Sequence, residues 1–420
     1  MSASALLGLD AARALDPARY AVGGRAPQTA LKPVSRDEVA EALRAATRDR
    51  LAVVPWGGGV ALPFEAEPER YDVALDLTAF DRVVEYQPED FTITAECGIG
   101  VAALARQVAA RGLLLPLEAA QAERATLGGA IAANASGPRR LRFGSPRDRI
   151  LGARFALSNG TIARTGGRVV KNVTGYALHR LLCGSRGGLG IVLEASLKLA
   201  PAPAGRAALV FAATPRQLAD QARWAFLPRL EPASVSVLGP GAARALPPLG
   251  SGGAAPLSGE PAAFAVVVGL EDDPVWVERQ RQSLASALGE PLARLEGAEA
   301  DELARSLADL ETGAPVRLTF ATAWNSPAAL GVVSATAAAD RAVFHALAGR
   351  LHLFPAPEIA PDLVRALEAS SFALIGWCGV GECRPEVPPQ AAVAELRARV
   401  RAALDPTATW ALGPRWERER

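Results

Sequence analysis

Apolar positions in the first part of the chain alternate between the period of two that is typical of strands and the three-and-four spacing that is typical of helices. The segment SRDEVAEALRAATRDR predicts a helix over 35–50, because Ser35 and Glu38 form a capping-box pattern in front of an apolar stripe. The strand-like run LAVVP follows directly. The runs VALDL, VVEY and FTITAEC predict further strands, and VAALARQVAARG predicts a helix that ends at Gly112. This order indicates one βαβ unit followed by antiparallel strands.

The segment from Ala125 to Gly144, ATLGGAIAANASGPRRLRFG, is rich in small residues and predicts an irregular loop. After it, RILGARFALSNGTIARTGG predicts a hairpin that turns at Asn159-Gly160. The run GIVLEASLKLAP alternates like a strand and stops at Pro201. We expect one domain to end there.

Beyond residue 201 the pattern predicts a second domain of α+β type over 202–400. The strand-like runs are AALVFAA, AFAVVVGL, VRLTFATAW and FALIGWCG, and PVWVERQRQSLASALG and AADRAVFHALAGRL predict helices. The stretch 238–261 is rich in Gly, Pro and Ala and predicts a flexible loop. We therefore expect a lead-in over 1–32, a first domain over 33–201, a second over 202–400 and a C-terminal return segment over 401–420.

The composition fits a globular protein of two or three domains, with 420 residues of which 50% are hydrophobic. The 45 basic residues are offset by 44 acidic ones, so no basic surplus points to nucleic acid. The chain has no apolar run long enough to span a membrane, and its start lacks the basic region of a secretory signal, so we expect a cytoplasmic protein. Four scattered cysteines do not form a disulfide framework, and Cys378 and Cys383 alone make at most half a metal site, so no metal is expected.

One motif favours a nicotinamide dinucleotide as an alternative. Gly98-x-Gly100-x-x-Ala103 follows a predicted strand and opens a helix, as in the dinucleotide-binding fingerprint. No second βαβ half follows it, which argues against a doubly wound domain. Hydrolase, zinc-protease and Walker motifs are absent, and the three histidines, His179, His345 and His352, are widely spaced and more typical of packed side chains than of ligands.

Clusters of small residues recur at the ends of predicted strands and indicate a different chemistry. They are Gly57–Gly59, Thr126–Gly129, Ser136-Gly137, Gly144-Ser145, Gly166-Gly167 and Gly184–Gly190. Successive backbone N–H groups in such turns form concave anion sites without needing a charged side chain. Several clusters in this order predict that the backbone surrounds one elongated anionic ligand, and a pyrophosphate fits that description best.

The same segments, in the same order, resemble the vanillyl-alcohol-oxidase type of flavoprotein, whose FAD domain is called PCMH-type. The resemblance is carried by VVPWGGGVAL, FTITAECGIGVAALARQVAARGLLLP, ATLGGAIAANASGPRRLRFGSPRDRILGARFALSNGTI and GSRGGLGIVLEASLKLAP. Within it, GGRVVKNVTGYALHRLLCGSRGGLG is most similar to the FAD-binding subunit type of glycolate oxidase. The implied fold is α+β: a PCMH-type FAD-binding domain of two α/β subdomains, followed by an α+β cap domain with an antiparallel sheet.

The resemblance also implies a set of cofactor-binding residues. The glycine loop is expected at the pyrophosphate, and the next cluster is expected towards the flavin. A short segment is expected at the ribityl and phosphate region, and the last glycine motif is expected at the adenine through main-chain contacts. Lys171, followed by Asn172 and Tyr176, is expected near the flavin. The first four groups are Trp56, Gly57, Gly58, Gly59, Val60 and Ala61; Thr126, Leu127, Gly128, Gly129, Asn134, Ser136 and Gly137; Gly144, Ser145 and Asp148; and Gly187, Gly190, Ile191 and Val192.

The implied activity is oxidation of glycolate or a similar 2-hydroxy acid, with electrons passing from non-covalently held FAD to a partner. The glycine loop carries Trp56 and no histidine, so no covalent flavin link is expected. The implied partners are a larger FAD-linked oxidase subunit and an iron–sulfur subunit, with any membrane association reached through them. The cap lacks the family's His-x-His and offers no identifiable base, and Gly188 replaces a usual threonine. A non-catalytic flavin-bearing or scaffolding subunit and a self-contained alcohol oxidase therefore remain open.

Overall fold

The computed structural model describes residues 14–62, 68–168, 175–246, 264–310, 317–321, 342–354, 362, 364, 365, 367, 373–378 and 391–412. The chain divides into two compact units. Unit 1 contains Met1–Ala135, Ser145–Ala202 and Val387–Arg420, and unit 2 contains Ser136–Gly144 and Pro203–Glu386. Both units are assembled from segments that are far apart in the sequence.

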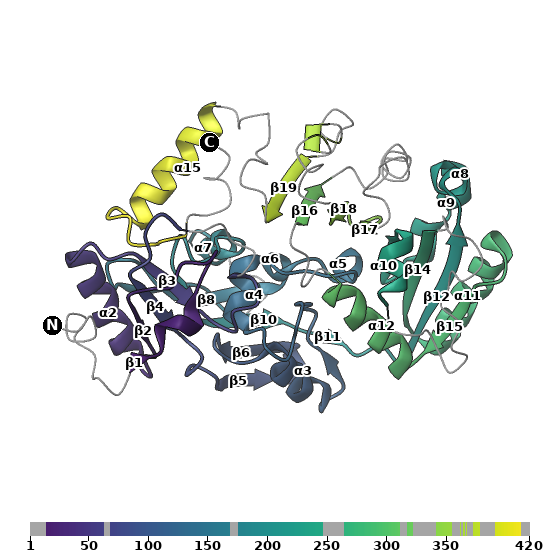
Figure 1. Cartoon of the computed structure of the whole chain (residues 1–420). Helices are drawn as coiled ribbons and strands as arrows, with labels where there is room; N and C mark the ends of the chain where they lie inside the picture. The colour runs from purple at the N-terminus through teal and green to yellow at the C-terminus, as the bar shows by residue number, and fades with distance from the viewer. Residues whose placement is uncertain are drawn as a thin grey trace. The chain divides into compact units, whose positions relative to one another are not determined.

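Unit 1 begins with a four-stranded sheet (Figure 1). Its order is β1-β2-β4-β3, with β2 and β3 parallel to β4 and β1 antiparallel to β2. The strands are β1 (Ala14–Leu15), β2 (Thr29–Leu31), β3 (Val53–Trp56) and β4 (Val73–Asp76). The predicted βαβ unit is confirmed, because helix α2 (Arg36–Arg48) joins β2 to β3.

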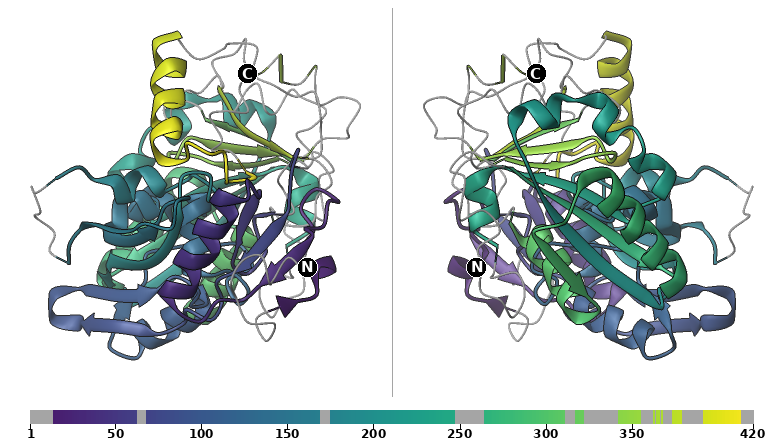
Figure 2. Two further views of the ribbon diagram at one scale, coloured as in Figure 1. Left: turned by 90° about the vertical axis from the view of Figure 1, so that its left-hand side faces the viewer. Right: turned by 90° about the vertical axis from the view of Figure 1, so that its right-hand side faces the viewer.

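Helix α2 is fixed at both its start and its apolar face. The Ser35 hydroxyl accepts a hydrogen bond from the Glu38 N–H at 3.1 Å, as the capping pattern predicts. Val39 and Leu43 are fully buried and pack with residues of both sheets of unit 1 in one core, and the helix is the purple one in the left-hand view of Figure 2. Trp410 from the C-terminal segment joins the same core and bridges to Val53.

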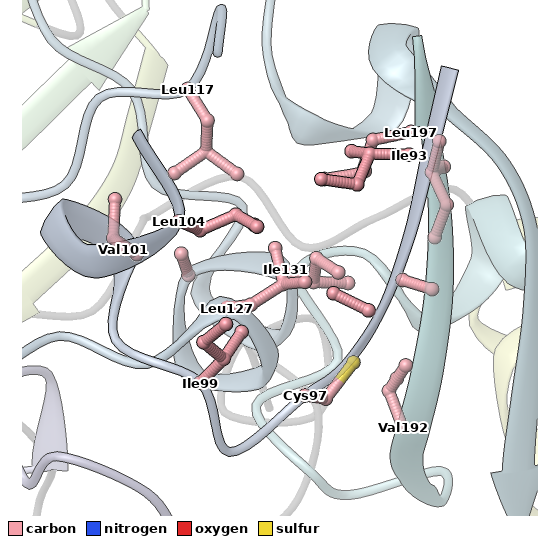
Figure 3. Close-up of a cluster of buried hydrophobic side chains, with 14 of the residues drawn as sticks. Ile93, Cys97, Ile99, Val101, Leu104, Leu117, Leu127, Ile131, Val192 and Leu197 are labelled. Carbon is pink, nitrogen blue, oxygen red and sulfur yellow. The ribbon is translucent and has the colours of Figure 1, made fainter. Parts of the chain in front are cut away.

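The second sheet of unit 1 is antiparallel throughout, with the order β5-β6-β10-β8-β9. Helices α3 (Val101–Ala109) and α4 (Leu127–Ala133) contribute to its core, where Ile93, Leu104 and Ile131 are buried (Figure 3). The predicted hairpin is confirmed, because β8 and β9 pair and Gly160 has φ +79° in the turn between them. The strands are β5 (Val83–Gln87), β6 (Thr92–Glu96), β8 (Ile150–Ala156), β9 (Ile162–Gly166) and β10 (Ile191–Lys198).

The dinucleotide-like motif forms a strand, a turn and a helix, but in a different setting from a dinucleotide-binding domain. Its strand, β6, lies between two antiparallel neighbours, so no doubly wound parallel sheet surrounds it. Gly98 has a local packing reason: a Cβ there would lie 2.2 Å from the Leu77 carbonyl oxygen. The nicotinamide alternative is therefore not supported.

Unit 2 is built on an eight-stranded sheet in which every pairing is antiparallel. The order is β15-β12-β14-β13-β17-β18-β16-β19. Helix α11 (Pro274–Leu288) packs with one face of β12 and α12 (Ala298–Asp309) with the other (Figure 1). The strands are β12 (Gly205–Ala213), β13 (Ser234–Leu238), β14 (Phe264–Asp272), β15 (Ala293–Glu296), β16 (Arg317–Ala321), β17 (Ala342–His345), β18 (Arg350–Leu353) and β19 (Ala373–Cys378).

Three local predictions are wrong. The predicted helix AADRAVFHALAGRL contains instead the hairpin β17–β18, because Ala342–His345 is buried on both faces of the sheet and lacks a strand-like alternation. The loop predicted over 238–261 begins with helix α10 (Pro240–Arg244); residues 247–263 lie outside the described part. The segment predicted as irregular, 125–144, contains α4 and the single turn α5 (Arg140–Phe143).

Shorter elements complete the described chain. They are β7 (Leu113–Leu114), which pairs with β11 (Ala200–Pro201), the helices α6 (Pro146–Arg149), α7 (Leu178–Leu182), α8 (Pro215–Ala219), α9 (Gln221–Trp224) and α15 (Ala391–Leu404), and the 3₁₀ helices η2 (Pro17–Tyr20), η4 (Pro88–Asp90) and η5 (Leu227–Leu230).

The segment Ser136–Gly144 belongs to unit 2 through its arginines. Arg139 pairs with Glu271 on β14 at 2.5 Å and with Asp301 on α12 at 3.2 Å. Arg142 pairs with Asp272 at 3.0 Å. Glu271 is buried, so this pairing neutralises a carboxylate that is removed from water.

Candidate cofactor site

The loop Gly57–Ala61 follows directly on β3 and carries unused hydrogen-bond donors. Among the described residues, no acceptor is present for the backbone N–H groups of these five positions. Gly59 has φ +68°, a left-handed conformation that glycine adopts without strain. A run of free N–H groups that includes a left-handed residue is the arrangement that binds anionic oxygens.

The loop is held by direct contact with a second turn of unit 1, Arg124–Thr126. A Cβ on Gly58 would lie 1.8 Å from the Arg124 carbonyl oxygen, and a Cβ on Gly57 would lie 2.2 Å from Thr126 Oγ1. Only glycine allows two backbones to approach this closely. The consecutive glycines are therefore required by the protein's own packing.

Two further contacts bring other glycine clusters into the same part of unit 1. A Cβ on Gly187 would lie 2.8 Å from Cγ of Pro55, which is on β3 just before the loop. A Cβ on Gly128 would lie 2.9 Å from the Cys97 carbonyl oxygen, at the end of β6. The clusters around residues 57, 126 and 187 are thus brought together by the fold, as the sequence predicts for loops around one ligand.

The second cluster does not provide the free N–H groups that the glycine pattern predicts. The N–H of Leu127 donates to the Ile99 carbonyl, that of Gly128 donates to the Cys97 carbonyl, and that of Gly129 donates to Thr126 Oγ1 at 3.2 Å. Thr126 caps α4, and the Leu127 side chain is fully buried in the core of Figure 3. This cluster fixes α4 and supports the first loop, and any contact with the cofactor must come from other atoms.

Two other predicted residues of unit 1 are engaged in local structure. Asp148 Oδ2 accepts from the Ser145 N–H at 2.7 Å and from the Ser145 hydroxyl at 2.9 Å, forming the capping box of α6. Asn134 has φ +49° at the end of α4, and its Oδ1 accepts from the Arg147 N–H at 3.3 Å. Their contact with the cofactor stays a prediction.

The remaining predicted residues fall into three groups. Ser136, Gly137 and Gly144 belong to the segment that packs with unit 2. Gly190 directly precedes β10, and Ile191 and Val192 begin it with both apolar side chains buried, so only main-chain atoms of these residues are available to a ligand. Lys171 and Asn172 lie outside the described residues, and the nearby Tyr176 side chain is 90% exposed.

The three histidines are packed side chains. His345 on β17 has its Nδ1 3.0 Å from the Ser236 hydroxyl, and His352 on β18 has its Nδ1 3.1 Å from the Thr319 hydroxyl. His179 is also buried, and burial lowers its pKa. Within the described part of the chain, no group of three or more His, Cys, Asp or Glu residues is placed to hold a metal ion.

FAD fits the residues present. The five loop N–H groups, which have no acceptor among the described residues, match the needs of a diphosphate, which accepts hydrogen bonds through its oxygens and is favoured by a nest of amides. The close packing of Gly57 and Gly58 keeps the loop in place before any ligand binds. No described helix has the length and apolarity to cross a membrane.

Comparison with known proteins shows which family and which folds the chain resembles. Residues 27–166, most of which lie in unit 1, match the family model described as FAD binding domain. The structure resembles that of p-cresol methylhydroxylase with substrate bound, with a TM-score of 0.74 over 98% of this chain and 95% of that chain at 14% identity. It also resembles alkyldihydroxyacetonephosphate synthase, with a TM-score of 0.68 over 92% of this chain and 77% of that one at 18% identity. The expected PCMH-type fold with an antiparallel cap is confirmed, and these likenesses concern the fold alone.

The sequence relatives are named as glycolate oxidase subunits and as a D-lactate dehydrogenase. The chain is 36% identical over 177 residues to glycolate oxidase subunit GlcD of Bacillus subtilis, which is 42% of this chain and 38% of that protein. It is 41% identical over 130 residues to glycolate oxidase subunit GlcE of Escherichia coli, covering 31% of this chain and 37% of that protein. It is 33% identical over 184 residues to D-lactate dehydrogenase of Anaerostipes hadrus, covering 44% and 38%. The matches thus span less than half of each relative.

Proposed function

We propose that this chain is the FAD-binding subunit of a glycolate-oxidase-like complex, which oxidises glycolate or a similar 2-hydroxy acid and passes the electrons to a partner. The proposal rests on the free N–H groups of Gly57–Ala61, in a domain of the FAD binding family. The similarity to both GlcD and GlcE supports the choice of complex. The partners are a larger FAD-linked subunit and an iron–sulfur subunit, and the complex works in the cytoplasm.

Bound FAD supplies the two-electron acceptor chemistry that such an oxidation needs. The chain's own contribution is to hold the diphosphate through main-chain amides, with the loop fixed by the Arg124–Thr126 turn. Binding is non-covalent, so acid or urea releases all of the flavin into solution. FAD present at 100 times its dissociation constant adds about 2.7 kcal/mol to the folding free energy, which raises the melting temperature.

The second candidate is a flavin-bearing subunit that does not turn over substrate itself. It is favoured by the two cap histidines, His345 and His352, whose Nδ1 atoms bond to hydroxyls within the sheet. A general base must reach the substrate proton within hydrogen-bond distance. Side chains held inside the sheet in this way are poor candidates for that role.

The experiment mixes purified, FAD-loaded protein anaerobically with glycolate or D-lactate and follows the flavin absorbance near 450 nm (about the usual flavin band, a property of the cofactor). Loss of absorbance supports turnover by this subunit. An unchanged band, with oxidation only when the partner subunits are added, supports the flavin-bearing role. Oxygen consumption without a partner would indicate a self-contained alcohol oxidase, and protein that neither contains nor takes up FAD would refute all three.

A further inference from the structure

The glycine loop is packed on its second side by an aromatic side chain. Trp56, the last residue of β3, lies against its own loop, since a Cβ on Gly59 would be 2.9 Å from Cζ2 of the indole. The indole also contacts Tyr20 from η2, with ring centroids 5.0 Å apart and an edge-to-face angle of 72°. Edge-to-face contacts of this kind hold two rings at a defined orientation.

Tyr20 is itself fixed by a buried polar network. Its hydroxyl donates to Asp76 Oδ2 at 2.7 Å, and its carbonyl accepts from the Tyr71 hydroxyl at 2.8 Å. Asp76 Oδ1 accepts from the N–H and the hydroxyl of Thr78, at 2.9 and 2.6 Å. Tyr20, Tyr71 and Asp76 are each less than 8% exposed. Burial, together with the Asp76 hydrogen bond, raises the pKa of Tyr20, so the phenol stays a donor throughout the neutral range.

The network reaches the loop through the ends of two parallel strands. Asp76 ends β4 directly beside Trp56, its register partner on β3, and the Leu77 N–H donates to the Trp56 carbonyl at 2.9 Å. The contacts therefore run from Thr78 through Asp76, Tyr20 and Trp56 to Gly59. A buried carboxylate that accepts three hydrogen bonds is well fixed, because leaving any of them unmade is costly.

We propose that Tyr20 and Asp76 are positioning residues for the diphosphate-binding loop: they hold the Trp56 indole against Gly59, so that the free N–H groups keep the arrangement in which they bind FAD. The assignment rests on the proposed function of that loop. This role requires no contact between either residue and the cofactor. Their effect is to reduce the ordering that the loop must undergo on binding, which is how preorganisation strengthens affinity.

The test measures the FAD dissociation constant by isothermal titration calorimetry for the full-length apoprotein and for Tyr20→Phe, Asp76→Asn and Tyr86→Phe. Tyr86→Phe is the matched control, because its hydroxyl donates at 3.2 Å to the Val108 carbonyl, away from the loop. We expect Tyr20→Phe and Asp76→Asn each to weaken FAD binding by about tenfold, the lower end of the range seen when an outer-shell partner of a metal ligand is removed. Tyr86→Phe should leave the dissociation constant unchanged.

Melting temperatures of the four apoproteins separate positioning from general destabilisation. The proposal is supported if Tyr20→Phe and Asp76→Asn lose more FAD affinity than Tyr86→Phe does at a similar loss of melting temperature. It is overturned if the three variants bind FAD alike. It is also overturned if Asp76→Asn binds FAD more tightly, since the carboxylate would then act only by repelling the diphosphate. If Tyr20→Phe does not fold, Tyr71→Phe gives the result: a three- to tenfold loss of affinity, the value of about one hydrogen bond, is expected, and no change overturns the proposal. Wild-type protein that binds no FAD would refute the proposed function itself.

Discussion

Gly58→Ala is expected to abolish tight FAD binding, because of the contact between the glycine loop and the Arg124–Thr126 turn. The added Cβ would lie 1.8 Å from the Arg124 carbonyl oxygen and 2.7 Å from its carbon. Real Cβ atoms do not approach backbone closer than 3.0 Å, so the loop or the turn must move by more than 1 Å. Since N–H···O bonds are made between 2.7 and 3.2 Å, such a shift breaks one or more of the bonds that the loop would make to the diphosphate.

The size of the effect follows from the bonds that are lost. A hydrogen bond to a charged group contributes about 1.5–3 kcal/mol, so losing one weakens FAD binding by about 10- to 150-fold. The overpacking also lowers stability by about 1–3 kcal/mol. Gly57→Ala should have a smaller effect, because the clashing atom, Thr126 Oγ1, belongs to a side chain that can rotate away at the cost of its one hydrogen bond from the Gly129 N–H.

Gly100→Ala is the matched control, since only the Ala103 Cβ lies within 4 Å of the added atom, at 3.8 Å. Calorimetric titration of the apoproteins with FAD should give the largest dissociation constant for Gly58→Ala and a smaller one for Gly57→Ala. The smallest values should be those of Gly100→Ala and wild type, which should be equal. The reasoning is refuted if Gly58→Ala binds FAD like wild type. Loss of FAD binding in Gly100→Ala alone would instead indicate that the turn starting at Gly98, and not the glycine loop, holds the diphosphate.

Three further predictions concern stability and reactivity. Arg139→Ala leaves the buried Glu271 without its partner and should lower the free energy of unfolding by about 3 kcal/mol in urea titrations; a change below about 0.5 kcal/mol, typical of an exposed residue, would contradict this. Burial acts to raise the pKa of Glu96, but hydrogen bonds from Arg82 outweigh it and leave the pKa below its ordinary value. The resulting stabilisation is present above the unfolded pKa of about 4.3 and is lost as the pH falls through the folded pKa. The urea midpoint should therefore fall more steeply in acid for wild type than for Glu96→Gln. Burial raises the pKa of Cys183 to about 12 and that of Cys97 well above its ordinary range, so iodoacetamide at pH 8 should label neither in the folded protein and both in urea, as peptide mass spectrometry would show.

The sequence predicts the elements whose local signals agree with their surroundings. Helix α2 has both a cap at Ser35 and one apolar face, and the β8–β9 turn has Asn159-Gly160. The hairpin β17–β18 is missed because Ala342–His345 is buried on both faces, so that its apolar spacing also fits a helix. Helix α4 is missed because its first turn contains Gly128 and Gly129, and glycine is a weak helix former. The reason for Gly128, its close contact with Cys97, appears only in the tertiary structure.

The candidate site, like the fold, is predicted only where the sequence carries a local signal. The glycine clusters are visible in the sequence because their composition is unusual, and the resemblance leads us to expect that they meet, as those around residues 57, 126 and 187 do in unit 1. Which N–H groups are free is decided by tertiary partners: those of Leu127 and Gly128 are taken by carbonyls of the segment Cys97–Ile99. Tyr20 and Asp76 carry no local signal, because the contact between them spans 56 positions of the chain.

The chain crosses between its two units at 135/136, 144/145, 202/203 and 386/387. Neither unit is therefore encoded by one uninterrupted stretch of gene. A truncation at residue 202 would keep Arg139 and Arg142 while removing Glu271 and Asp272, and it would also remove Trp410 from the core that it shares with α2. Recombination that exchanges the cap for another must therefore replace the nine-residue insertion Ser136–Gly144 as well, or accept unpaired arginines on the flavin domain.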